Sequence, residues 1–154
     1  MGSAVCAREA KAAGERISAM ISLEMIGYYN DRPGGQAFPL PLMGLMFSTT
    51  PDFIAVVGNL ASRDLVRRIA GSLTRGCDIP VETLATVGIV PGVDFSDHLS
   101  FWEIGCPAVM ITDTAFYRNP NYHSEGDTIS TLDFNRMARL LQGLVKAIEE
   151  LCNA

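Results

Sequence analysis

Short apolar segments alternate along the chain with helical segments, and this alternation is the strongest constraint on the fold. The strand-like segments cover residues 18–29, 52–59, 80–88 and 106–114. The helical segments cover about residues 4–15, 62–76 and 131–152, and a short helix is expected to begin near Ser96 or Asp97. Strands that alternate with helices typically form a largely parallel sheet with helices on its faces. The sequence therefore predicts an α/β fold.

The size and composition of the chain fit one globular domain over residues 1–154. Apolar residues make up 48% of the chain and charged residues 19%, which is typical of folded rather than disordered proteins. The net charge of −5 argues against nucleic acid or an anionic membrane as a partner. No apolar stretch reaches the roughly 18 residues of a membrane span, and no signal peptide is visible. We therefore expect a cytoplasmic protein whose four cysteines are reduced.

Three polar segments stand where the predicted strands end. Glu24 interrupts the apolar segment ISLEMIGYY, Ser96-Asp97-His98 precedes the expected short helix, and His123 lies in the loop RNPNYHSEGDT. In open α/β sheets, ligands bind beyond the carboxyl ends of the strands. These segments are therefore the candidates for a functional site.

Glu24 and His123 each have two interpretations. A carboxylate in an apolar strand is costly unless it is paired or metal-bound, but Glu24 could also point to solvent or pair with an arginine. Histidine and carboxylates are the usual ligands of catalytic zinc, yet His123 could simply be a surface histidine. Asp127 is close enough in sequence to orient the His123 ring, or it could begin a turn before the last helix.

Asp97 and His98 are adjacent, so their side chains diverge and are not expected to bind one ion together. Asp97 or Ser96 fits the N-cap of the short helix, and a polar role near the pocket is the alternative. Other chemistries lack their motifs, because the chain has no GxSxG, GxxxxGK[ST] or GxGxxG sequence. Cys106 begins an apolar strand and is expected to be a buried small side chain rather than a nucleophile.

Taken together, these segments resemble a known family. ISLEMIGYY, FIAVVGN and the long string GVDFSDHLSFWEIGCPAVMITDTAFYRNPNYHSEGDTISTLDF occur in this order. They resemble the C-terminal half of the co-catalytic zinc aminopeptidases of metallopeptidase family 28. The resemblance covers nearly the whole chain, and the SDH…FW and RNP.YH…DT motifs are specific.

The resemblance implies a fold and a site. The fold is a three-layer α/β/α sandwich with a mixed, mostly parallel sheet, and two zinc ions bind beyond the strand ends. Glu24 matches a ligand of one zinc and His123 a ligand of the other. Asp97, His98, Tyr122 and Asp127 match motif positions in the wall of the pocket or beside the ligands. The implied substrate is a peptide, from which N-terminal residues are removed.

The chain departs from the family pattern in its catalytic motifs. An HxD sequence, a bridging aspartate and a Glu-Glu pair that supplies the general base do not precede Glu24. Each zinc would therefore keep about one ligand, and no residue of this chain is assigned as catalytic. We expect weak metal binding and little or no peptidase activity from the chain alone. MGS at the start fits an expression remnant or an internal methionine of a longer gene.

Two further consequences and two alternatives follow. Strands missing from the sheet would leave an edge or an apolar face uncovered, which predicts a homo-oligomer. One alternative function is a non-catalytic scaffold or assembly domain that keeps the fold without the site. A second, weaker alternative is a glutaminyl-cyclase-like acyltransferase, which uses similar zinc ligands on the same fold.

Overall fold

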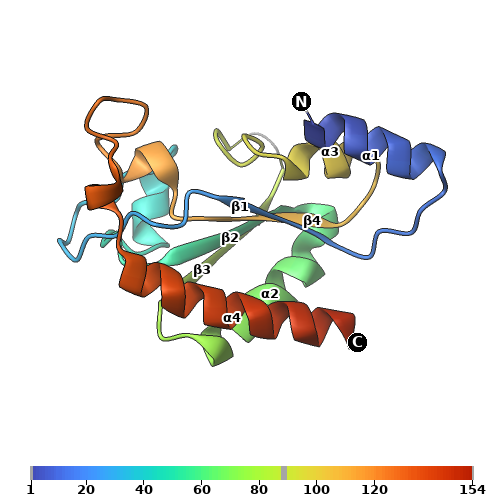
Figure 1. The fold of residues 1–154 in the computed structure, drawn as a ribbon. Helices are drawn as coiled ribbons and strands as arrows, with labels where there is room; N and C mark the ends of the chain where they lie inside the picture. Colours follow the sequence, from blue (N-terminus) through green and yellow to red (C-terminus); the bar gives the residue numbers. More distant parts are fainter. Residues whose placement is uncertain (1, 88–89, 154) are drawn as a thin grey trace.

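The computed structural model describes residues 2–87 and 90–153 and contains one sheet with helices on both sides (Figure 1). The helices and strands are α1 (Gly2–Ala12), β1 (Met20–Glu24), β2 (Ile54–Asn59), α2 (Arg63–Gly76), β3 (Val81–Thr86), α3 (His98–Glu103), β4 (Ala108–Thr112) and α4 (Phe134–Cys152). Within these residues, no helix combines the length and the apolar character needed to cross a membrane.

The sheet has the strand order β1-β4-β2-β3 and is mixed. β1 pairs with β4 and β2 pairs with β3 in parallel, whereas β2 and β4 are antiparallel. The carboxyl ends of β1 and β4 therefore lie at the same end of the sheet as the starts of β2 and β3. The predicted mixed, mostly parallel sheet is confirmed, and the reversal between β4 and β2 decides which segments meet at each end.

One face of the sheet is covered by α2 and α4 (Figure 1). Ile54 and Val56 of β2 and Val109 and Ile111 of β4 are fully buried against these helices. The two helices approach closely, since a Cβ on Gly76 would lie 2.7 Å from the Cα of Gly143. This face holds the largest apolar core.

The opposite face carries α1 and α3 near one end of the sheet, which completes the predicted three layers (Figure 1). Ala7 of α1 and Phe101 of α3 pack with Cys106 and Ala108 there. Toward the other end, a smaller core forms around Phe53, Ala55, Val57 and Met110. Loops and a short 3₁₀ helix, rather than α-helices, border this smaller core.

The first strand is shorter than predicted. It ends at Glu24, and residues 25–29 leave the sheet after Met25, whose φ is +51°. The carboxylate of Asp113 explains the break, because it accepts hydrogen bonds from the backbone N–H groups of Gly27 and Tyr28. These amides are turned toward a side chain instead of a neighbouring strand.

Two local features complete the fold. Within the long segment between β1 and β2, Pro41–Leu45 forms a 3₁₀ helix with a proline at its start, where no N–H is needed. Ser62 precedes α2 without capping it, because its hydroxyl accepts the N–H of Ala108 instead. Residues 88 and 89, at the end of the predicted strand 80–88 and the start of the next loop, lie outside the described residues.

Candidate functional site

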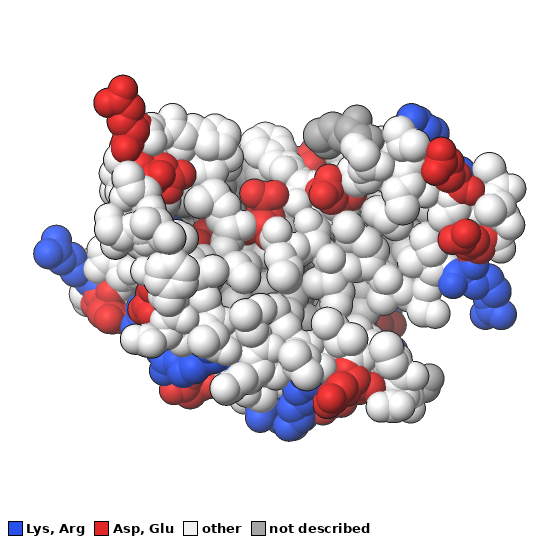
Figure 2. Space-filling view, in the orientation of Figure 1, with Lys and Arg blue, Asp and Glu red and all other residues white. Residues whose placement is uncertain are grey.

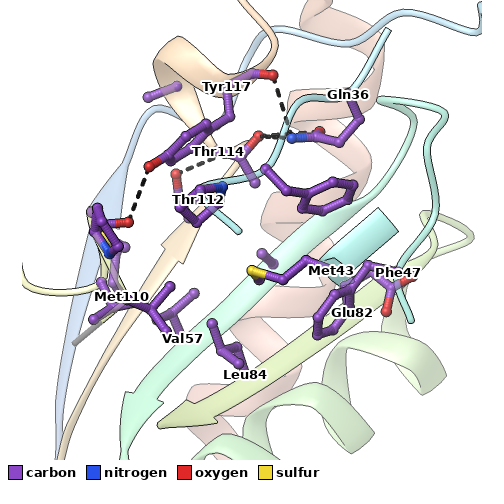
Figure 3. A pocket seen from close by; sticks show the side chains of 18 of the residues that line it. Gln36, Met43, Phe47, Val57, Glu82, Leu84, Met110, Thr112, Thr114 and Tyr117 are labelled. Carbon is purple, nitrogen blue, oxygen red and sulfur yellow. Dashed lines mark hydrogen bonds between the residues drawn. The ribbon is translucent and has the colours of Figure 1, made fainter. Parts of the chain in front are cut away.

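A cavity opens on the loop-bordered face, where β1 and β4 end and β2 and β3 begin (Figure 3). The strands form its floor, and its walls come from segments 36–47, 90–95 and 112–122. The sheet reversal brings these three segments to one end of the molecule. Of the predicted site residues, Glu24 and Tyr122 line this cavity.

The floor contains a row of four side chains that crosses the whole sheet. Glu24 is in register with Thr112, Thr112 with Ala55, and Ala55 with Glu82. Strands lie about 4.8 Å apart, so the backbones of Glu24 and Glu82 are separated by about 14 Å. A carboxylate thus stands at each end of the row, with two small side chains between them.

The rest of the cavity is mainly apolar. A second row of Met110, Val57 and Leu84 runs beside the first, as Figure 3 shows. Aromatic and other apolar side chains form the walls, namely Phe38, Met43, Phe47, Phe95, Phe116 and Tyr117. No lysine, arginine or histidine lines the cavity among the described residues. The cavity therefore suits an apolar group or a cation with an apolar stem.

Asp113, directly after β4, fixes the end of the cavity near Glu24. It is fully buried and accepts hydrogen bonds from the N–H groups of Gly27 (3.0 Å), Tyr28 (2.7 Å) and Ala115 (2.9 Å). Burial raises the pKa of Asp113 to about 6, and the three amides and the charge of Arg118 oppose that rise. This carboxylate joins the turn after β1 to the loop after β4.

Arg118 binds the long loop before β2 to the end of the cavity near Glu24. Its guanidinium donates to Oε1 of Gln36 (3.0 Å) and to the carbonyl of Phe53 (2.8 Å), and it lies 4.4 Å from the Phe53 ring. Burial lowers the pKa of Arg118 to about 10, and the negative charge of Asp113 opposes that change. Gln36 in turn donates to Thr114, as drawn in Figure 3. The cavity walls are thus tied together by buried polar groups.

Tyr122 and His123 lie together at the edge of the cavity. Their rings stack with centroids 3.9 Å apart, and Tyr122 also contacts Phe116 at 5.5 Å. His123 is exposed and has a φ of +55°, an uncommon conformation for a residue other than glycine. Such backbone strain often occurs at functional sites.

Asp127 does not contact His123 through a hydrogen bond in the described residues. Its carboxylate accepts a long bond from Nδ2 of Asn119 (3.5 Å), and Asp127 is exposed. Asn119 itself is buried and also accepts the N–H of Asn121 (2.9 Å). The geometry thus gives Asp127 a part in holding the loop through Asn119, and the predicted orienting role remains a prediction.

Asp97 and His98 diverge, as their adjacency in the sequence implies. Asp97 occupies the predicted N-cap position of α3 and is exposed, but its side chain makes no capping hydrogen bond within the described residues. Ser96 does not supply it either, since its hydroxyl bonds that of Ser22 (2.7 Å).

His98 is fully buried beneath the wall of the cavity rather than in it. Its Nε2 donates to the carbonyl of Val93 (2.7 Å), its ring packs edge-on against Trp102, and Nδ1 has no hydrogen-bond partner among the described residues. Burial lowers the pKa of His98, while the Val93 carbonyl and the charges of Asp94, Asp97 and Glu24 oppose that change. A neutral His98 that holds Val93 in the wall fits these contacts.

The described residues do not provide a complete zinc site. No group of three or more histidine, cysteine, aspartate or glutamate side chains is arranged to hold a metal ion in the described part of the chain. Catalytic zinc usually has three protein ligands. Cys106 adds none, because it is buried, with its thiol directed at the carbonyl of Ile17 (3.6 Å).

Some site residues were not identified from the sequence. Asp113 and Arg118 lie in the segment TDTAFYRN, to which no role was assigned, and Gln36 lies in a loop without any pattern. Glu82 could have been found, because alternation in VETLAT places Glu82 on the same face as Leu84. That face turned out to be the floor of the cavity.

Comparisons of the sequence with known proteins point to one family. The sequence model of peptidase family M28 matches residues 1–148. The uncharacterized protein YfbL of Escherichia coli K12 is 47% identical over 146 residues, which cover 94% of this chain and 44% of YfbL. Leucine aminopeptidase 1 of Sclerotinia sclerotiorum is 28% identical, over 94% of this chain and 34% of that protein.

Solved structures show the same fold. The LapA aminopeptidase of Legionella pneumophila superposes with a TM-score of 0.66 at 23% identity, over 95% of this chain and 34% of LapA. LapB of the same organism gives 0.71 at 20% identity, over 97% of this chain and 35% of LapB. The chain thus spans less than half the length of these relatives. On its sequence and its fold, it belongs to peptidase family M28.

Proposed function

We propose that this chain forms the substrate pocket, and supplies two metal ligands, of a zinc-dependent exopeptidase that removes N-terminal residues from peptides. The observation that carries the proposal is the cavity with Glu24 at one end of its floor and Tyr122, which stacks on His123, at its edge. Relatives described as leucine aminopeptidases and as the LapA aminopeptidase support a peptide substrate.

The zinc ligands in this proposal are Glu24 and His123. The described residues hold too few ligands for a catalytic zinc, so the proposal gives this chain no chemical step. Its residues instead bind and orient the substrate. The apolar walls receive a side chain, and the buried network of Asp113, Arg118 and Gln36 keeps those walls in place.

A binding experiment tests the pocket independently of turnover. Leucinamide, a minimal analogue of a peptide N-terminus, is titrated into the isotope-labelled chain, and NMR shifts of the Val57, Leu84 and Met110 methyl groups are followed. Saturable shifts at these floor residues are expected. Shifts spread over α2 and α4, or no shifts at all, would argue against the pocket.

Zinc titration tests the ligands. We expect weak binding by calorimetry that is lost in the Glu24→Ala and His123→Ala variants and kept in Glu103→Ala, which changes an exposed acid outside the cavity. With zinc and an aminoacyl chromogenic substrate, we expect the chain to show no turnover above the Glu24→Ala, His123→Ala double variant. Clear turnover above that level would refute the expected inactivity.

A non-catalytic scaffold is the second candidate function. The observation that favours it is the lack of a three-ligand cluster among residues 2–87 and 90–153. If the chain binds no zinc even at high concentration, the scaffold becomes the better description. Stoichiometric zinc that depends on both Glu24 and His123 would instead favour a functional metal site completed by other ligands.

We also propose that the chain forms a homo-oligomer through the β1 edge of the sheet. In the described residues, β1 pairs only with β4, and Leu23 is 48% exposed. Figure 2 shows a band of mainly uncharged side chains across the middle of this side of the molecule, between acidic groups near β1 and charged groups along the lower edge of α4. Light scattering should give more than one chain mass. A Leu23→Lys variant should shift the chain toward monomer, whereas Leu45→Lys, on an exposed turn, should not.

A further inference from the structure

We propose that Glu82 selects peptides whose N-terminal side chain carries a positive charge, namely lysine or arginine. This inference rests on the proposed function, because it assumes that an N-terminal residue occupies the cavity. It adds the class of side chain that the cavity accepts.

The position of Glu82 is the first argument. Glu82 lines the floor at the β3 side, beside Met43 and Phe47, as Figure 3 shows. It ends the row that begins with Glu24, and the two backbones are about 14 Å apart across Thr112 and Ala55. A substrate held near Glu24 would therefore need a long side chain to reach Glu82.

The charge of the cavity is the second argument. None of the ion pairs in the described part of the chain involves Glu82, and no basic side chain lines the cavity there. Among the described residues, the carboxylate of Glu82 accepts a single hydrogen bond, from the N–H of Ser48 at 3.3 Å. A carboxylate has about four acceptor sites, so most of its capacity remains for a ligand.

The apolar side chains beside the row of Glu24 and Glu82 are the third argument. Val57, Leu84 and Met43 surround the path toward Glu82. Lysine and arginine carry their charge on an apolar stem that packs well against such surfaces. A leucine side chain would fill the near part of the cavity but leave Glu82 without a counter-charge.

A matched pair of ligands tests the inference. Argininamide and citrullinamide have nearly the same shape, but only the first has a charged side chain, and both carry the same α-ammonium group. Calorimetry or NMR titration of the 154-residue chain should show argininamide binding at least about tenfold more tightly, the usual gain from a charge-assisted hydrogen bond. The excess should shrink as ionic strength rises.

Three variants locate the effect. Glu82→Gln keeps an oxygen for the Ser48 N–H but removes the charge, so the preference for argininamide should fall to within about twofold. Glu103→Gln removes an exposed charge outside the cavity and should keep the full preference. Glu82→Asp retains the charge on a shorter stem and should keep part of the preference. Thermal unfolding of both Glu82 variants verifies that each of them is folded.

The outcomes separate this inference from the proposed function. If both amides bind in the cavity with equal affinity, or if Glu82→Gln keeps the preference, Glu82 only anchors Ser48 and the inference is wrong while the pocket stands. If neither amide binds at the floor residues, the pocket assignment and the inference fail together. A preference that is lost only in the Glu82 variants supports both.

Discussion

The two faces of the sheet differ in what covers them and therefore in what they can do. On one face, α2 and α4 bury Ile54 and Val56 completely. On the other, Ala55 and Val57 of the same strand lie under a cavity bordered by loops. One strand thus contributes alternate residues to a closed core and to an open pocket. Because the helices on one face supply the main core, loops are free to shape the other.

Removing Asp113 should break this arrangement most severely. Asp113→Ala would leave three buried or partly buried N–H groups without this acceptor and Arg118 without its nearby negative charge. We expect a loss of about 3–5 kcal/mol in the free energy of unfolding, measured by urea denaturation. Asp97→Ala, at an exposed position without a capping bond, is the control and should change stability by less than about 0.5 kcal/mol.

The pH dependence of the free energy of unfolding should reflect the titration of Asp113. The pKa of Asp113 is raised from 3.8 to about 6 in the folded protein, so folding binds a proton between these values. The proton on Asp113 stabilises the folded state by roughly 3 kcal/mol. This stabilisation is complete below about pH 4 and is lost as the pH rises through 6. Asp113→Asn removes this titration, so the wild-type chain should lose stability relative to the variant between pH 4 and 6. Parallel curves would contradict the prediction.

A pair of adjacent valines compares the two faces directly. Val56→Ala removes methyl groups from the closed core and should cost about 2–3 kcal/mol. Val57→Ala removes them from the floor of the cavity, where the new space joins an existing one, and should cost about 1 kcal/mol. Equal losses in thermal or urea unfolding would mean that the two faces contribute equally to stability.

The smallest effect is expected at the rim of the loop-bordered face. Leu45 is 83% exposed at the end of the 3₁₀ helix Pro41–Leu45, so Leu45→Ser should change the free energy of unfolding by less than about 0.5 kcal/mol. A larger loss would show that this turn is part of the folded core. Calorimetric melting curves distinguish the two results.

Most of the fold could be predicted from the sequence, because periodicity reports burial. The apolar residues in four segments have the spacing of the elements that form there. They predict strands at 52–59 and 106–114, where β2 and β4 lie, and helices at 62–76 and 131–152, where α2 and α4 lie. The end of β1 could not be predicted, since the apolar segment continues to Tyr29 while the chain leaves the sheet at Met25. The cause is Asp113, which lies 86 residues after Gly27 and acts through a tertiary contact.

The candidate site was only partly predictable, because tertiary contacts decide which residues reach it. Glu24 and Tyr122 were placed near the pocket from their motif, and both line the cavity. His98 was assigned to the pocket region, but packing on Trp102 buries it behind Val93. Glu82 becomes notable only once the strand order places it in one row with Glu24, and strand order is not encoded in local sequence.

The row from Glu24 to Glu82 also means that the spacing of the strands sets the length of side chain that fits the pocket. Each position in the row belongs to a different strand, and neighbouring strands are separated by a nearly fixed spacing of about 4.8 Å. A carboxylate moved from Glu82 to the position of Ala55 would come one whole spacing closer to Glu24. The length of side chain that such a pocket measures can therefore change only in discrete steps, each set by the backbone rather than by the loops.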